Sequence, residues 1–127
     1  MINLRIEPTA KTPLIFCNAE TGIILLEGRS IPENSAEYFQ PVYDWIDDYV
    51  NTPNAKTDFQ VKLEYFNTSS SKCILDVFKK LEKINSGGSN VTINWHYEED
   101  DEDMLEAGED YEAIINVPFK MIEVGEE

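Results

Sequence analysis

The chain has few of the side chains with which enzymes most often build active sites. Its 127 residues include one histidine, His96, and two cysteines, Cys17 and Cys73. It contains no Cys-x-x-Cys pair, no Gly-Lys-Ser phosphate loop, no Gly-x-Ser-x-Gly elbow and no Gly-x-Gly-x-x-Gly motif. His96 lies on the polar phase of an expected strand, where a surface or hydrogen-bonded histidine is the ordinary case. The sequence therefore predicts a protein that is not an enzyme and has no cofactor and no bound metal.

Long apolar runs and basic residues are also scarce. No stretch is apolar enough to span a bilayer and the first residues lack the layout of a signal peptide, so we expect a soluble, cytoplasmic protein. Ten Lys and Arg stand against 25 Asp and Glu, which gives a net charge of −15. Nucleic acids and anionic membrane surfaces repel such a chain, so neither is expected as a partner. Both cysteines fall inside expected regular elements, which favours buried free thiols over a disulfide.

The acidity is concentrated in one segment. Ten of the acids lie between Glu98 and Glu112, and without this segment 15 acids and 10 bases leave a charge of −5. An EF-hand calcium loop that began at Asp101 would need Gly at its sixth position, where the chain has Glu106. A solvated acidic face and a docking patch for a basic partner both fit the segment. The candidate docking patch consists of Glu98, Glu99, Asp100, Asp101, Glu102 and Asp103.

What is present fits one folded domain, residues 1–127, with 42 % hydrophobic residues. Alternating apolar residues predict a strand at residues 2–6, and two apolar runs joined by a polar loop with Gly22 predict a hairpin of residues 14–17 and 23–26. Helical spacing predicts a helix that Asn34 or Ser35 caps and that runs to residue 50. Pro41 either bends this helix, which we favour, or marks its first turn. A loop around Pro53 follows.

The second half continues the alternation of helices and strands. We expect a strand at 59–65, a helix from 70 that stops at Gly87-Gly88, and a strand at 91–97. The acidic segment predicts a short helix, interrupted by Gly108, that lies over the sheet edge. A last strand at 114–124 contains Pro118, which places it at the edge of the sheet and mildly favours a monomer. The fold class is therefore α/β, a mixed sheet with helices against it, in the order βββαβαβαβ.

The joint between the strand at 59–65 and the next helix contains four hydroxyl residues in succession, Thr68-Ser69-Ser70-Ser71. One of them, Thr68 or Ser69, can cap the helix, but a cap needs only one. Helix N–H groups and the helix dipole stabilise a phosphate at such a joint, and Lys72 lies one turn along. A partner docked over the joint would instead meet a buried double negative charge. From the residues alone the phosphate has two possible sources, a bound ligand or a group attached to one of the four hydroxyls. A phosphate on Thr68 would make the joint a phosphorylation switch, with the three serines as competing acceptors.

Four segments together carry a family resemblance. They are Ile31-Pro32-Glu33-Asn34, Tyr65-Phe66-Asn67-Thr68-Ser69-Ser70-Ser71-Lys72, Val91-Thr92-Ile93-Asn94-Trp95 and the acidic segment from Asp101 to Gly108. Across essentially its whole length the chain resembles the SiaC family of bacterial regulatory phosphoproteins, which in turn resembles the STAS fold of anti-sigma factor antagonists. STAS proteins usually carry Asp-Ser-Ser-Gly at this joint, whereas here Asn67 replaces the acid and no Gly follows.

The resemblance implies a function. In that family the threonine that matches Thr68 is phosphorylated by a dedicated kinase, and a PP2C-type phosphatase removes the phosphate. The unmodified form binds and activates a diguanylate cyclase, which links the switch to cyclic-di-GMP and biofilm formation. Asn67, Ser69, Ser70, Ser71 and Lys72 would then form the setting of the phosphosite and part of the partner surface. Two alternatives stay open from the residues alone: a constitutive acidic adaptor, and a metal-dependent enzyme that uses residues 98–112.

Overall fold

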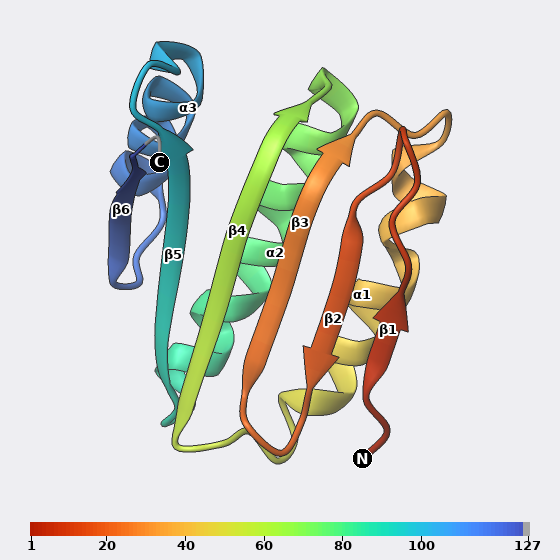
Figure 1. The fold of residues 1–127 in the computed structure, drawn as a ribbon. Coiled ribbons are helices and arrows are strands. Elements are labelled where there is room, and N and C mark those ends of the chain that lie inside the picture. Colours follow the sequence, from red (N-terminus) through yellow and green to blue (C-terminus); the bar gives the residue numbers. More distant parts are fainter. Residues whose placement is uncertain (126–127) are drawn as a thin grey trace.

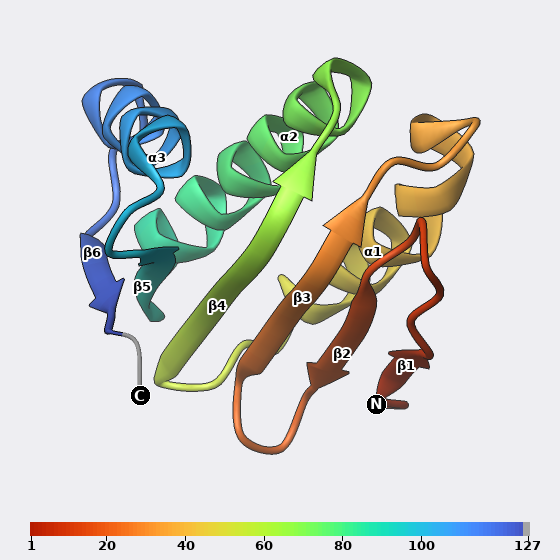
Figure 2. The same cartoon turned by 45° about the horizontal axis from the view of Figure 1, so that its top comes forward.

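All three helices of the chain lie on one face of a six-stranded sheet (Figure 1, Figure 2). This architecture is seen in a computed structural model that describes residues 1–125. In chain order its elements are β1 Leu4–Ile6, β2 Leu14–Asn18, β3 Ile23–Ser30, α1 Ser35–Tyr49, β4 Lys56–Phe66, α2 Thr68–Ser86, β5 Asn90–Glu98, α3 Glu102–Ile114 and β6 Phe119–Val124. The expected α/β class and the order βββαβαβαβ are thus confirmed.

The sheet keeps the strands in sequence order, β1-β2-β3-β4-β5-β6. β1, β2 and β3 are antiparallel neighbours, and loops without a helix join them. β3, β4, β5 and β6 are parallel, and a helix makes each connection between them. The carboxyl ends of β3, β4 and β5 therefore lie at one edge of the sheet, and α1, α2 and α3 all begin there (Figure 1).

The core lies between the sheet and the helices. Because only one face of the sheet is covered, its strands keep the period-two alternation that the sequence shows, although most of them are parallel. Phe59, Val61 and Leu63 of β4 face the helices. The stripes of α1 and α2 that meet them contain Phe39, Val42, Ile46, Ile74, Val77, Phe78, Leu81 and Ile84, as the helical spacing predicts. Cys17 and Cys73 are buried free thiols in this core, as expected.

Two expectations about the second half are wrong in detail. α3 is not interrupted at Gly108, which lies inside one continuous helix. The last strand begins only at Phe119, because Ile114 ends α3 and Pro118 precedes the strand. There the Pro118 carbonyl accepts a hydrogen bond from the N–H of Ile93, so Pro118 joins the sheet by the one backbone group it can offer. The edge position of this strand is confirmed.

α1 passes through Pro41 as a single helix, as the sequence analysis favoured. The Asn34 side chain accepts the N–H of Glu37, so Asn34 rather than Ser35 is the cap. β4 begins at Lys56, three residues before the expected strand. Within residues 1–125, no helix has both the length and the apolar composition needed to cross a bilayer.

Candidate functional site

The joint between β4 and α2 is a tight corner built around Asn67. Asn67 has extended backbone angles, φ −84° and ψ 173°, and its side chain accepts the N–H of Ser70 at 2.9 Å. α2 then begins at Thr68, two residues earlier than the apolar pattern indicates. The expectation that Thr68 or Ser69 caps the helix is therefore wrong. Asn is among the strongest N-cap residues, and its short amide reaches the free N–H groups of the first turn.

Two of the four hydroxyls are bonded to residues of other elements. Ser70 is fully buried, lies 2.8 Å from the Ser30 hydroxyl and donates to the Ser30 carbonyl at 3.1 Å. The Ser69 hydroxyl lies 2.7 Å from that of Ser35, the first residue of α1. These bonds join the end of β3 and the starts of α1 and α2. The hydroxyls of Ser69 and Ser70, which a cap alone would not need, thus serve the packing of the corner.

Thr68 is in a different situation from its neighbours. Its side chain is exposed, and its hydroxyl has no hydrogen-bond partner among residues 1–125. The Ser71 hydroxyl is half-buried and donates to the Thr68 carbonyl at 2.6 Å. Lys72 is exposed one turn along. Of the four hydroxyls, the one on Thr68 is open to a modifying enzyme without loss of any contact in this part of the chain.

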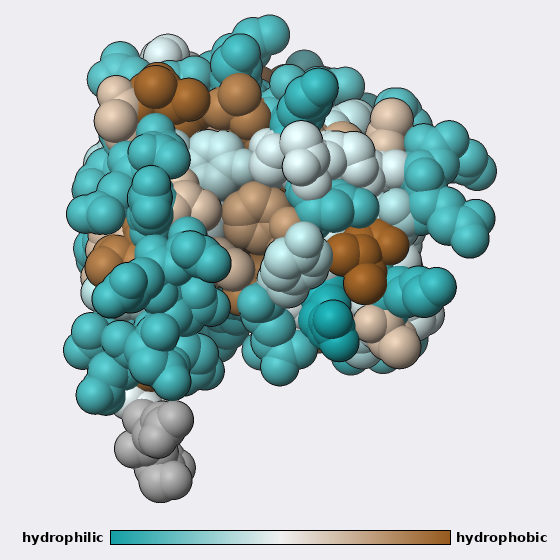
Figure 3. Space-filling view, turned by 90° about the horizontal axis from the view of Figure 1, so that it is seen from above, coloured by the Kyte–Doolittle hydropathy of each residue, from teal (hydrophilic) through white to brown (hydrophobic). Residues whose placement is uncertain are grey.

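The start of α2 also has backbone N–H groups that can bind an anion. The N–H of Ser70 goes to the Asn67 side chain and that of Ser71 to the Asn67 carbonyl. The N–H groups of Thr68 and Ser69 come before these and are the ones that a helix leaves without an internal partner. Together with the positive end of the helix dipole, they favour a negative charge beside Thr68. Figure 3 looks down on this end of the molecule.

α3 supports the corner from the other side. The Tyr111 hydroxyl donates to the Ser71 carbonyl at 2.8 Å, and its pKa is raised to about 12 by burial. Phe66, at the end of β4, meets the ring of Trp95 edge-on at 6.0 Å. The Trp95 indole N–H donates to the Met104 carbonyl at 2.9 Å. The corner is therefore held between α1 and α3, and the exposed Thr68 lies on a rigid support.

α3 lies this close because Gly108 has no side chain. A Cβ on Gly108 would lie 2.5 Å from Trp95 Cδ1 and 2.6 Å from Met121 Cε. The Gly in the acidic segment is thus a contact residue between helix and sheet, and not the helix breaker that the sequence indicates.

The acidic candidates are divided between two roles. Glu98 ends β5, and Glu99 and Asp100 form the exposed turn after it. Asp101 is the N-cap of α3 and accepts the N–H of Met104 at 3.0 Å, and Glu102 and Asp103 lie in the first turn. Acidic residues at the start of a helix stabilise it, so Asp101, Glu102 and Asp103 contribute to the stability of α3. Among residues 1–125, no three His, Cys, Asp or Glu side chains come close enough to hold a metal ion.

His96 is a hydrogen-bonded histidine, as expected. Its Nε2 lies 2.7 Å from Gln60 Oε1. Burial, and then the positive charge of Lys62, hold the pKa of His96 below its ordinary value of 6.5. Burial also raises the pKa of the Cys17 thiol to about 12, which leaves it unreactive at neutral pH.

Sequence reasoning missed the residues that hold the corner from a distance: Ser30, Ser35 and Tyr111. Their partners lie 34 to 40 residues away along the chain. No local sequence pattern indicates such pairs, because only the order of the parallel strands brings the two residues of each pair together at the carboxyl ends of the strands.

Comparison with known proteins identifies the family. The model of the "SiaC family regulatory phosphoprotein" matches residues 6–124. An uncharacterized protein of Pseudomonas aeruginosa strain UCBPP-PA14 is 34% identical over 119 residues, which cover 94% of each chain.

Solved structures agree. Apo-SiaC from P. aeruginosa is similar with a TM-score of 0.87 and 33% identity, over 96% of this chain and 99% of that one. A chain in the crystal structure of the diguanylate cyclase SiaD in complex with its activator SiaC, from the same species, gives a TM-score of 0.89 and 32% identity, over 95% and 99%. The corner described above is therefore that of a relative of SiaC, and the chain belongs to the SiaC family of regulatory phosphoproteins.

Proposed function

We propose that the protein is a phosphorylation-controlled binding switch with no catalytic activity of its own, acting in the cytoplasm. The unmodified form binds and activates a diguanylate cyclase and so raises cyclic-di-GMP and promotes biofilm formation. A partner kinase phosphorylates Thr68 and releases the cyclase, and a PP2C-type phosphatase restores the binding form.

One observation carries the choice of Thr68. Its hydroxyl is exposed and free of partners within residues 1–125, whereas Ser69 is bonded to Ser35, Ser70 is buried and Ser71 is bonded to the Thr68 carbonyl. A kinase must place the acceptor hydroxyl in its own active site. Phosphorylation of Ser70 would require the corner to open and the bond to Ser30 to break. Thr68 can be presented with the fold intact.

The position also explains why a phosphate would act on the complex and not on the fold. Phosphorylation adds about −1.5 to −2 charges at pH 7. At a helix N-terminus each negative charge is stabilising by about 0.3–1 kcal/mol when exposed. A partner that covers Thr68 must strip water from that charge, which costs several kcal/mol unless the partner supplies a cation. The folded state therefore tolerates the phosphate, and a complex packed over the corner does not.

The choice of a cyclase as the output rests on similarity. The SiaC chain that this protein matches over nearly all of its length is the activator of the diguanylate cyclase SiaD. The kinase and the phosphatase come from the family resemblance alone.

Two variants test the switch. Thr68→Ala should abolish phosphorylation and keep cyclase binding, because the side chain has no structural partner. Thr68→Glu should weaken binding by about tenfold, or ~1.4 kcal/mol, since a carboxylate reproduces part of the charge. Binding is measured by calorimetry with the cyclase recovered from the native host, and Ser86→Ala, an exposed hydroxyl at the other end of α2, is the matched control. A phosphopeptide map of protein from that host identifies the acceptor. Phosphate found only on the serines, with normal binding by Thr68→Glu, would refute the proposal.

A constitutive acidic adaptor is the second candidate, because Glu98, at the end of β5, and Glu99 and Asp100, in the turn after it, are exposed. In that case Thr68 variants bind the partner like the unmodified protein. Neutralising Glu99 and Asp100 would then weaken binding, and the loss would shrink at high salt.

A further inference from the structure

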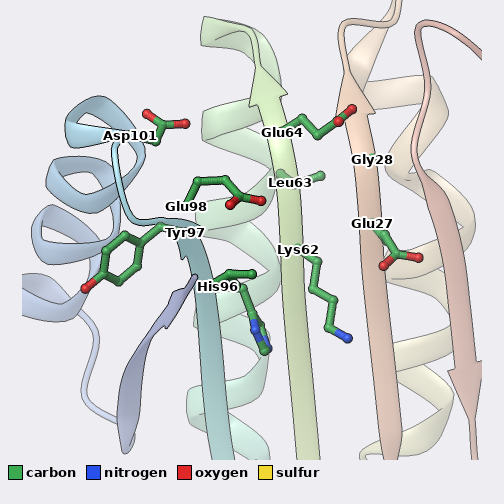
Figure 4. Close-up of a pocket in the computed structure, with 10 residues that line it drawn as sticks. Glu27, Gly28, Lys62, Leu63, Glu64, His96, Tyr97, Glu98 and Asp101 are labelled. Carbon is green, nitrogen blue, oxygen red and sulfur yellow. The ribbon is translucent and has the colours of Figure 1, made fainter. Parts of the chain in front are cut away.

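The face of the sheet opposite the helices is uncovered within residues 1–125 (Figure 2). Towards the carboxyl ends of β3, β4 and β5 this face is hollowed into a groove of about 680 Å³. Figure 4 shows the groove, with Glu27 on β3, Lys62 and Glu64 on β4, and His96 and Glu98 on β5. Asp101, at the start of α3, also lines it.

The groove carries an excess of negative charge. It is lined by four carboxylates, those of Glu27, Glu64, Glu98 and Asp101, against the single lysine Lys62. His96 adds little positive charge at neutral pH, because burial and Lys62 lower its pKa. Four negative charges and one positive leave a net charge of −3.

No ion pair within the described chain neutralises these carboxylates. The two ion pairs among residues 1–125 are Arg5–Glu7 and Lys80–Asp47, and neither lies in the groove. Glu27 and Lys62 are register partners on β3 and β4, yet their charged groups do not form an ion pair. A concave wall that holds several unpaired charges of one sign focuses its field on the space between them.

We propose that this groove is the docking site for a basic segment of a partner protein, one that places arginine or lysine side chains between β3, β4 and β5. Charge complementarity selects this occupant. A second copy of the chain is disfavoured, since each copy carries a net charge of −15 and would be repelled. A guanidinium group suits the site because its fork of N–H donors can bridge carboxylates on neighbouring strands.

The groove differs from the acidic run that the sequence singles out. Only Glu98 and Asp101 of that run reach it, and Glu27 and Glu64 come from other strands. It is also independent of the proposed switch. A phosphate on Thr68 has the same sign as the groove, so it would not remove the attraction for a basic segment. The groove accounts for recognition of a cationic partner, and Thr68 for the control of a complex packed over the corner.

The test uses the full-length protein, labelled with ¹⁵N, and a blocked hexa-arginine peptide as the probe. Amide shift changes should centre on Lys62, Glu64, His96 and Glu98. Glu27→Gln combined with Glu98→Gln should weaken binding about fivefold, the loss of two partly exposed ion pairs. The matched control, Glu109→Gln with Glu112→Gln on the exposed side of α3, changes the net charge equally and should cost less than about twofold at 0.15 M salt.

A lysine variant should change the affinity for the peptide in the opposite direction. Lys62→Gln removes the one lysine of the groove and should tighten peptide binding about twofold, whereas Lys83→Gln near the end of α2 should not. Equal weakening by the two double variants, or shift changes centred on α3, would overturn the proposal. The proposal would also be overturned if the protein formed a dimer that dissociated in the Glu27→Gln, Glu98→Gln variant, because the groove would then bind a second copy of the chain. None of these results depends on phosphorylation of Thr68.

Discussion

Ser70 provides the sharpest test of how the corner is held. Its hydroxyl is fully buried and bonds both the hydroxyl and the carbonyl of Ser30, and Ser30 is itself fully buried. In Ser70→Ala, the Ser30 hydroxyl loses its hydrogen-bond partner. A buried polar group without a partner costs about 1–3 kcal/mol. We therefore expect Ser70→Ala to lower the free energy of unfolding by about 2 kcal/mol, and Tm by roughly 5–10 °C.

The reverse substitution should cost less. In Ser30→Ala the Ser70 hydroxyl keeps its bond to the Ser30 carbonyl, because that carbonyl belongs to the backbone. The expected loss is about 1 kcal/mol or less, the net value of one ordinary hydrogen bond. Ser30→Ala combined with Ser70→Ala leaves no orphan hydroxyl from the pair, so its cost should be smaller than the sum of the two by about 1 kcal/mol.

Urea unfolding followed by tryptophan fluorescence measures all three variants, and the transition midpoint is reliable where the slope m is unchanged. Ser71→Ala is the matched control, since its hydroxyl bonds only the nearby Thr68 carbonyl. It should cost less than about 0.5 kcal/mol. If Ser30→Ala proved more costly than Ser70→Ala, or if the two effects were additive, the idea that this buried pair joins β3 to α2 would be wrong.

Three further predictions concern the surroundings of the corner. Gly108→Ala should destabilise the protein by about 1–2 kcal/mol in urea unfolding despite the better helix propensity of Ala, because its Cβ overlaps the buried Trp95 ring; a gain in stability would contradict the packing. Asn67→Ala removes the cap of α2 and should cost about 1 kcal/mol by the same measurement, and an unchanged midpoint would rule out the cap. The pKa of His96 is lower in the folded than in the unfolded state, so its protonation opposes folding: stability should fall as pH drops below 6.5, and His96→Gln should show a smaller fall in pH-dependent thermal unfolding. An identical pH profile for His96→Gln would contradict this.

The local patterns predicted the elements well where one short-range cause dominates. Alternation along β4 and β5 and the stripes of α1 and α2 depend only on one face being buried, and the structure shows that face. The errors came where a residue has two possible uses. Thr68 and Ser69 are the expected caps of α2, but Asn67 caps it, and Gly108 is the expected break in α3 but fits against Trp95. Each choice depends on neighbours that are distant in sequence.

By itself, the sequence determined the α/β class, the order of elements, the position of the hydroxyl corner and the local nature of the negative charge. These follow from periodicity, capping chemistry and composition, which act over a few residues. Only the tertiary structure decided which hydroxyls are bonded and which one is free, since Ser30, Ser35 and Ser70 meet through the parallel strand order. It also brought Glu27, Glu64 and Glu98 together on the open face, because register between strands, and not spacing along the chain, sets which charges share a groove.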